Sequence, residues 1–221
     1  METKQEYKKA IDYLCALMQE GKIKKGDKFP TERNISETLV ISRNSTREAL
    51  RVMECMGVME RRQGSGNYMI NNMSTSLKEL IVLMLTINSI NKKELCEFRR
   101  QMEKAVCTVI INCNNDDFCK MMIDLLNEKT YDLQSEVNRD KKFHQLLIEK
   151  TENRFWIILM NAVMEVYREW IDYIIYNAND ELREALKKSH LSIIEGIKNH
   201  DIMKCLDAID SHYDLIEKNL K

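Results

Sequence analysis

Three of the four histidines and one aspartate have a spacing that could bind a metal ion. Asp140 and His144 are four residues apart, which places both side chains on one face of a helix. His190 and His212 lie about ten residues before and about eleven residues after a polar break at 199–201. If the helices on either side of this break are antiparallel, the two histidines lie at similar heights in a bundle. The sequence therefore predicts that all four side chains contact one ion.

Imidazole and carboxylate ligands suit a divalent transition metal, so we expect Zn, Ni, Mn or Fe without choosing among them. The alternative is that each histidine is an ordinary core or surface residue. His200 is interpreted as structural, because it is rotated away from His190 and lies at a helix C-terminus, where it complements the helix dipole. We predict no catalytic residues, because beyond Glu103 the sequence offers no distinct general acid–base pair near such a metal.

A second group of polar residues is typical of a helix that binds DNA. Arg43, Asn44 and Arg47 project from one side of a predicted helix, whereas Ala49 and Met53 project from the other. Arginine can bind guanine and asparagine can bind adenine in the major groove, and amides at a helix start can bind phosphate. The alternative is that these residues form the solvated face of an ordinary surface helix.

The elements that must position these arginines are predicted from start and stop signals. Gly21 ends a first helix, Pro30 and Thr31 begin a second, and Ser42 begins a third. Two short extended runs around Gln63–Gly66 then predict a β-hairpin. The predicted helices cover about residues 7–18, 31–39 and 43–56, and the hairpin covers 58–70. This order of elements is that of a winged helix-turn-helix domain.

The rest of the chain is predicted to be entirely helical. Only one of the six glycines and no proline occur after residue 76, which favours long helices with short polar links. We count seven helical stretches, at about 77–88, 92–113, 115–129, 135–150, 152–177, 180–199 and 201–219. The predicted fold is mostly α, with a DNA-binding domain at 1–70, a linker at 71–76, and an all-α bundle of six to seven helices at 77–221.

The charges, apolar runs and cysteines of the sequence indicate the compartment in which we expect the protein. The net charge is −1, but residues 1–70 contain 13 basic and 10 acidic side chains, so only this part is basic. The apolar run Leu80–Leu85 is far too short to cross a bilayer. Seven cysteines without a C-x-x-C pair, and a polar N-terminus, favour a reduced environment. We expect a cytoplasmic protein with no membrane partner.

The first 70 residues resemble the GntR family of bacterial transcription regulators. The motifs are G-D-K-F-P-T-E-R at 26–33, S-R-N-S-T-R-E-A-L at 42–50 and Q-G-S-G at 63–66. One departure is Val40, which stands where the family more often has glycine, so the turn is expected to be slightly altered. By this resemblance, the DNA-contacting residues are Arg33, Ser42, Arg43, Asn44, Ser45, Arg47, Gln63 and Gly64.

The remainder resembles the effector domain of the FadR branch of this family, called FCD. The motifs are D-x-x-F-H at 140–144, T-x-N at 151–153, H-x-x-I at 190–193, the run from Asp201 to His212, and R-x-x-x-E at 99–103. In this branch a metal helps to bind a small organic acid, and all four ligand positions are filled here. The resemblance implies that Arg99 binds the carboxylate of the effector. The alternative is that Arg99 only pairs with Glu103.

We therefore expect a homodimeric, ligand-responsive regulator, with repression favoured over activation. Its partners would be a double-stranded DNA operator with two half-sites and a small carboxylate effector. A metal-sensing regulator, in which the ion itself is the signal, is one alternative. A metal-dependent enzyme is another.

Overall fold

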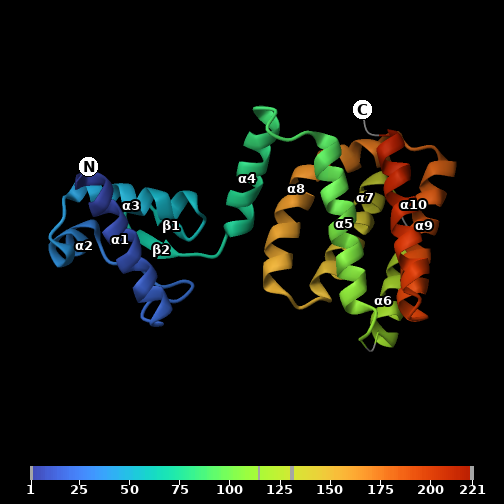
Figure 1. Ribbon diagram of the computed structural model, residues 1–221, viewed down its shortest axis with the longest axis horizontal. Coiled ribbons are helices and arrows are strands. Elements are labelled where there is room, and N and C mark those ends of the chain that lie inside the picture. The colour runs from blue at the N-terminus through green and yellow to red at the C-terminus, as the bar shows by residue number, and fades with distance from the viewer. Residues whose placement is uncertain (1, 114, 130–131, 220–221) are drawn as a thin grey trace. The chain divides into compact units, whose positions relative to one another are not determined.

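The computed structural model describes residues 2–113, 115–129 and 132–219. Within these ranges it contains ten α-helices and two β-strands (Figure 1). The chain divides into two compact units, residues 1–79 and 80–221. No described helix is long and apolar enough to cross a membrane. The predicted fold class, mostly helical with an N-terminal winged helix-turn-helix, is confirmed.

The first unit contains three helices and a hairpin. The elements are α1 (Glu2–Gln19), α2 (Glu32–Leu39), α3 (Arg43–Cys55), β1 (Met59–Arg62) and β2 (Gly66–Met69). Thr31 caps α2 by accepting a hydrogen bond from the amide of Asn34, and Ser42 caps α3 by accepting one from the amide of Ser45. Both predicted helix starts are thus confirmed.

Apolar residues from the helices and the strands form the core of this unit. Ala10 and Leu14 of α1 and Ala49 and Leu50 of α3 have no exposed surface. They lie on the inner faces of two amphipathic helices that pack together, which leaves the polar face of α3 in solvent. The strands are antiparallel, with Met59 opposite Met69, and join the core through Met59. Helix α3, whose polar face carries several of the predicted DNA contacts, is therefore held in place by a packed apolar core. We call α3 the reading helix.

Val40 ends α2 in a left-handed conformation, with φ 54° and ψ 51°. A β-branched residue is strained there, at a cost of about 1–2 kcal/mol relative to the right-handed region. The side chain is 89% exposed, so packing does not compensate. The backbone thus keeps the conformation that glycine favours at this position, and the altered turn expected from the sequence is not needed.

The second unit is a bundle of long helices. The remaining elements are α4 (Met73–Thr86), α5 (Lys92–Ile110), α6 (Asp116–Asn127), α7 (Leu133–Glu149), α8 (Arg154–Asn177), α9 (Asp180–Lys198) and α10 (Ile202–Asn219). The seven helices predicted after residue 76 match these in order, within a few residues. Helix α4 begins inside the segment 71–76 that was predicted as a linker, and the two units divide within this helix. The domain boundaries stay a prediction.

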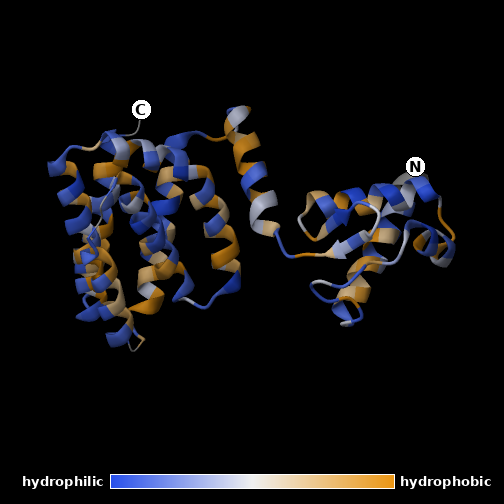
Figure 2. Cartoon of the chain, turned by 180° about the vertical axis from the view of Figure 1, so that it is seen from behind, coloured by the Kyte–Doolittle hydropathy of each residue, from blue (hydrophilic) through white to orange (hydrophobic). Residues whose placement is uncertain are grey.

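Helices α9 and α10 form a close pair in the bundle. A Cβ atom at Gly196 would lie 2.8 Å from the backbone nitrogen of Cys205, so only glycine allows this approach. Hydrophobic residues of the bundle, coloured orange in Figure 2, alternate along each helix with hydrophilic ones. The largest fully buried side chains here include Phe143, Tyr167 and Tyr213. Phe143 and Tyr213 precede and follow predicted metal ligands in the sequence.

Candidate metal centre and DNA-binding surface

Three histidines from three helices meet in the interior of the bundle. His144 belongs to α7, His190 to α9 and His212 to α10, and their exposed fractions are 1%, 4% and 0%. One nitrogen atom of each lies within 4.8 Å of the others, a spacing that allows all three to contact one ion. The ring centroids of His190 and His212 are 4.4 Å apart, because the two helices pack closely on each other. The structure thus brings together three of the four predicted metal ligands.

Asp140, the fourth predicted ligand, lies at the edge of this cluster. Its Oδ1 atom is 3.6 Å from Nε2 of His190 and 3.8 Å from Nε2 of His144. These distances are too long for hydrogen bonds, but they would allow a common ion between the atoms. The group of mutually close ligand atoms contains the three histidines without Asp140. Asp140 is therefore near two of the three histidines, and its role as a ligand stays a prediction.

Two of the histidines have a polar neighbour close to Nδ1, and for His212 this neighbour is a hydrogen-bond partner. The Nδ1 atom of His144 lies 2.7 Å from Oε1 of Glu103, and that of His212 lies 3.0 Å from Oγ of Ser189. The hydroxyl of Ser189 donates its only proton to the carbonyl of Leu186, so it must accept a proton from His212. His212 is therefore protonated on Nδ1 and has its lone pair on Nε2. A partner on Nδ1 is the usual arrangement for a metal-binding imidazole.

The Nε2 atoms of the three histidines have no hydrogen-bond partner in the part of the chain that the structure describes. Buried polar atoms without partners are rare in folded proteins, so three of them close together are an arrangement that fits a bound ligand. Burial lowers the pKa of His190 and His212 well below the usual value, which keeps both rings neutral. Neutral imidazoles with free lone pairs, beside a carboxylate, are a donor set that fits a divalent transition metal.

Arg99 and Glu103 form a buried charged pair beside the cluster. Nη2 of Arg99 lies 3.5 Å from Oε1 of Glu103, and both side chains are almost fully buried. Burial opposes ionisation of Glu103, but His144 and Arg99 together lower its pKa below the usual value. The Nε atom of Arg99 has no hydrogen-bond partner among the described residues. The pairing of Arg99 with Glu103 therefore exists, and it leaves part of the guanidinium available.

Two hollows adjoin the cluster, and Asp140 lines both. The hollow at Arg99 and His144 has a volume of about 30 Å³, roughly that of one water molecule. The larger cavity, of about 410 Å³, adjoins His190. It is lined by charged residues of α7 and α9, including Arg139, Arg183 and Lys187. The cluster is therefore close to a cavity large enough for a small molecule, whereas the hollow at Arg99 is too small for one.

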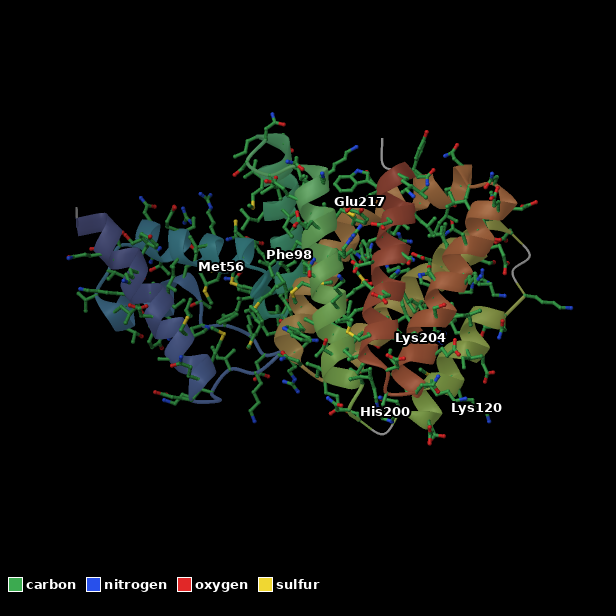
Figure 3. All side chains as sticks on the ribbon, turned by 45° about the vertical axis from the view of Figure 1, so that its right-hand side comes forward. Met56, Phe98, Lys120, His200, Lys204 and Glu217 are labelled. Carbon is green, nitrogen blue, oxygen red and sulfur yellow. The ribbon has the colours of Figure 1, made fainter. Side chains whose placement is uncertain are left out.

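His200 is separate from the cluster. Figure 3 labels it at the end of the bundle where α9 joins α10. Its Nδ1 atom lies 2.6 Å from the carbonyl oxygen of Ile111. This contact ties the turn to the segment after α5 and agrees with the structural role predicted for His200.

Most of the predicted DNA-contacting residues lie on the surface of the first unit. Helix α3 exposes Arg43, Asn44 and Arg47, while its opposite face is buried in the core. Arg33 is exposed on α2, and the hairpin turn exposes Gln63 and Gly64. Ser42 is exposed, but Ser45 is 4% exposed and does not face solvent. The structure therefore exposes seven of the eight residues, whereas the hydroxyl of the eighth, Ser45, is covered by Glu6 of α1, to which it donates a hydrogen bond.

Acidic residues already contact two of these arginines. Nη2 of Arg47 lies 3.3 Å from Oε2 of Glu32, and Nε of Arg33 lies 2.7 Å from Oε1 of Glu37. Such exposed pairs contribute about 0–1 kcal/mol and are readily exchanged for a phosphate. Arg43 forms no ion pair with any described residue. The same holds for Arg51, so α3 exposes two guanidinium groups without an ion pair among the described residues.

Three functional contacts were missed by the sequence reasoning: those of Glu103 with His144, Ser189 with His212, and Glu6 with Ser45. Each joins residues on different helices, so no local spacing could indicate it. The only available signal was the R-x-x-x-E motif, which includes Glu103 but says nothing of His144.

Comparison with known proteins follows the two units. Residues 6–69 match the family of bacterial regulatory proteins called gntR, and residues 94–215 match the FCD domain. The chain is similar to the HTH-type transcriptional regulator LutR of Bacillus subtilis, with 26% identity over 82% of this chain and 95% of LutR. It is also similar to a protein of Escherichia coli named as a regulatory protein of the L-lactate dehydrogenase operon, with 24% identity over 95% of this chain and 84% of that protein.

Among solved structures, a GntR protein of Streptococcus agalactiae has the same fold. The TM-score is 0.68 at 21% identity, covering 96% of this chain and 99% of that chain. The matching families and relatives are transcription regulators and not enzymes. With its winged helix-turn-helix matching one family model and more than half of its length matching the other, this chain belongs to the GntR family of bacterial transcription regulators, in the FadR-type branch with an FCD domain.

Proposed function

We propose that this regulator binds a double-stranded DNA operator as a homodimer, and that a small organic acid bound at a divalent metal in the helical bundle changes its DNA affinity. The observation that carries this proposal is the convergence of three buried, unpartnered Nε2 atoms beside Asp140 and Arg99. A histidine cluster without an ion would leave these atoms unpaired in the core. Repression is the expected sign of regulation.

His144, His190, His212 and Asp140 would hold the metal, which would be Zn, Ni, Mn or Fe. When bound, the ion supplies a positive centre that attracts the oxygen atoms of an acid. Glu103 and Ser189 orient two of the rings, and the buried surroundings keep His190 and His212 neutral. Partners of this kind typically change metal affinity by about 10–100-fold.

Arg99 is the proposed partner for the carboxylate of the effector. Its guanidinium is planar and can bind a carboxylate with two hydrogen bonds. Arg99 lines the hollow that Asp140 and His144 also line, so an acid could contact the arginine and the metal ligands together. This hollow holds about one water molecule, so binding of an acid requires the surrounding side chains to move. Through such a change of packing, binding of the acid in the bundle would alter the DNA affinity of the winged helix-turn-helix domains, which we call the reading heads.

The predicted DNA contacts are Arg33, Ser42, Arg43, Asn44, Ser45, Arg47, Gln63 and Gly64. The exposed arginines of α3 suit base edges or phosphates, and the hairpin turn suits the backbone or the minor groove. A dimer is supported by α4, an apolar helix with no buried residue, on which Leu80 and Leu83 are more than half exposed, as is Ile87 directly after it. Apolar surface of this extent on one helix is typical of an interface.

A metal-sensing regulator is the second candidate. The observation that favours it is the small hollow at Arg99, because the ion site needs no further space while an acid does. Retention of metal after extensive dialysis would argue against a sensor, since a signalling ion must exchange.

The proposed function is tested by the binding of the protein to DNA from upstream of its own gene. We expect a specific complex at moderate salt, and a change in its affinity when metal and an acid are added together. L-lactate is a reasonable first acid, because one relative is named for an L-lactate dehydrogenase operon. No specific complex with this DNA would argue against the proposed operator. A complex that responds to metal alone would select the sensor.

A further inference from the structure

Glu6 of α1 is hydrogen-bonded to the start of the reading helix α3. Its Oε2 atom accepts a hydrogen bond of 2.8 Å from the hydroxyl of Ser45 and one of 3.3 Å from the backbone amide of Ser42. In the sequence, Glu6 lies 36 positions before Ser42 and 39 positions before Ser45. A negatively charged group is thus held at the positive end of the helix whose exposed arginines are proposed to read DNA.

The hydroxyl groups at this point form an ordered chain that ends on Glu6. The hydroxyl of Ser42 donates to Oγ of Ser45 at 2.8 Å, and the hydroxyl of Ser45 donates to Glu6. Each hydroxyl has only one proton, so neither serine has one left for a phosphate while this chain persists. The backbone amide of Ser42 is engaged by the same carboxylate.

Ser42 and Ser45 are also among the proposed DNA contacts. A phosphate at the start of α3 would require the donors that Glu6 now uses, because amides and hydroxyls at a helix start are its usual partners. Two anions cannot share these donors at hydrogen-bond distance. The hydrogen bonds from Ser45 and Ser42 lower the pKa of Glu6, so the carboxylate is ionised in neutral solution.

We propose that Glu6 limits the DNA affinity of the reading head by competing with a DNA phosphate for the amide of Ser42 and the hydroxyl of Ser45. This inference rests on the proposed assignment of these two serines as DNA contacts. A phosphate can contact the start of α3 only when Glu6 leaves, so the wild-type protein makes this contact in only part of its complexes, and its binding to any DNA backbone is weakened by the same factor. Because this cost is the same for every DNA sequence, it lowers the absolute DNA affinity and leaves the ratio of specific to non-specific affinity unchanged.

A purely structural role for Glu6 makes the opposite prediction. The packing of α1 on α3 is provided by apolar residues such as Ala10 and Leu14, which are fully buried without any contribution from Glu6. If Glu6 served only to hold α1 in place, removing its charge would loosen the reading head and weaken DNA binding. Removal of the Glu6 charge should therefore raise the DNA affinity if Glu6 competes with a phosphate, and lower it if Glu6 only holds α1 in place.

The experiment measures binding of the full-length protein to a short mixed-sequence DNA duplex by fluorescence anisotropy over a series of salt concentrations. Glu6→Gln keeps an acceptor oxygen but removes the charge. We expect it to raise the affinity about three- to tenfold at low salt, as for the loss of a charge from a helix start. We also expect the slope of log affinity against log salt to become steeper by up to about 0.9, because one more phosphate is contacted.

The matched control is Asp12→Asn, which removes one negative charge from an exposed position of the same helix. We expect its affinity to change less than about twofold, with an unchanged salt slope, since a distant surface charge is screened. In a protein that also carries Ser45→Ala, the effect of Glu6→Gln should be smaller, because one of the contested donors is gone.

Equal affinities for Glu6→Gln and Asp12→Asn, or a weaker complex for Glu6→Gln with an unchanged salt slope, would overturn the inference. If Glu6→Gln does not fold, as judged by thermal unfolding, Glu6→Ala is measured in the same way and must raise the affinity. Failure of the wild-type protein to bind any duplex at low salt would instead overturn the proposed DNA-binding function itself.

Discussion

Ser189 lies 3.0 Å from Nδ1 of His212 and fixes the proton of that imidazole, although the two residues belong to different helices. Because the serine hydroxyl donates to Leu186, His212 must donate to the serine from Nδ1, which leaves the lone pair on Nε2. The close pairing of α9 with α10, which Gly196 allows, brings the two residues together.

We therefore expect Ser189→Ala to weaken metal binding by about tenfold, since the imidazole loses the partner that sets its orientation and tautomer. Competition with a coloured chelator measures the affinity. Ser211→Ala is the control, because Ser211 is exposed next to His212 and its hydroxyl only donates to the carbonyl of Asp207. Equal metal affinities of the two variants would show that the contact with His212 has no effect on the site.

Arg99→Gln should weaken binding of a small carboxylate by about 10–100-fold while metal binding changes little. The reason is that the guanidinium provides charged hydrogen bonds to the acid, whereas the imidazoles hold the ion. Calorimetry on the metal-loaded protein measures the affinity for the acid. Arg99→Lys keeps the positive charge but lacks the planar guanidinium, so its affinity for the acid should lie between those of the wild-type protein and Arg99→Gln. Lys120→Gln removes an exposed cation elsewhere on the bundle and should match wild type.

Some of this site was predictable from the sequence, for reasons that particular residues make clear. Asp140 and His144 share a helix, so their spacing alone placed them on one face. His190 and His212 flank a polar break, and an antiparallel pair of helices then brings them to similar heights. The contribution of Ser189 could not be predicted in this way. It precedes His190 in the sequence but contacts His212, and that depends on the distance between two helices.

The fold was predictable for similar reasons, because capping residues and the scarcity of glycine and proline indicate long helices. The segment 71–76 shows the limit of such signals. Its polar residues predicted a linker, and the boundary between the domains stays a prediction, but residues 73–76 form the first turn of α4, where Asn72 accepts a hydrogen bond from the hydroxyl of Thr75. Small polar residues are common both in linkers and at helix starts, so only the contacts that follow decide between them.

The metal-free protein should lose stability as the pH falls below about 6.5. Burial lowers the pKa of His190 and His212 in the folded state, so below the ordinary histidine pKa the unfolded chain binds more protons than the folded one. Their contribution to the free energy of unfolding is constant above this range and decreases as the pH falls toward the folded-state values. Urea unfolding between pH 7.5 and 5.5, after removal of metal with a chelator, measures this loss.

His190→Gln removes one of these groups, so its unfolding free energy should depend less steeply on pH over the same range. The comparison of slopes does not require the variant to be as stable as wild type. A slope equal to that of wild type would mean that His190 takes up a proton as readily in the folded protein as in the unfolded chain.

Val40→Gly should stabilise the first unit by about 1 kcal/mol, because glycine adopts the left-handed conformation without strain. The gain from removing strain is larger than the entropy that glycine adds to the unfolded chain. For a unit of this size the melting temperature should rise by about 4–8 °C. Val40→Ala, which keeps a Cβ atom, serves as the control and should give much less. A lower melting temperature for Val40→Gly would show that the side chain has a stabilising role despite its exposure.

The three converging histidines are proposed to hold a metal ion. The metal content of the wild-type protein and of His212→Ala, purified side by side without added metal or chelator, is measured by elemental analysis. We predict a stoichiometric divalent transition metal in the wild-type protein and little or none in the variant. Absence of metal from the wild-type protein, persisting after incubation with Zn, Ni, Mn and Fe salts, or the same metal content in both proteins, would show that the three histidines do not hold an ion.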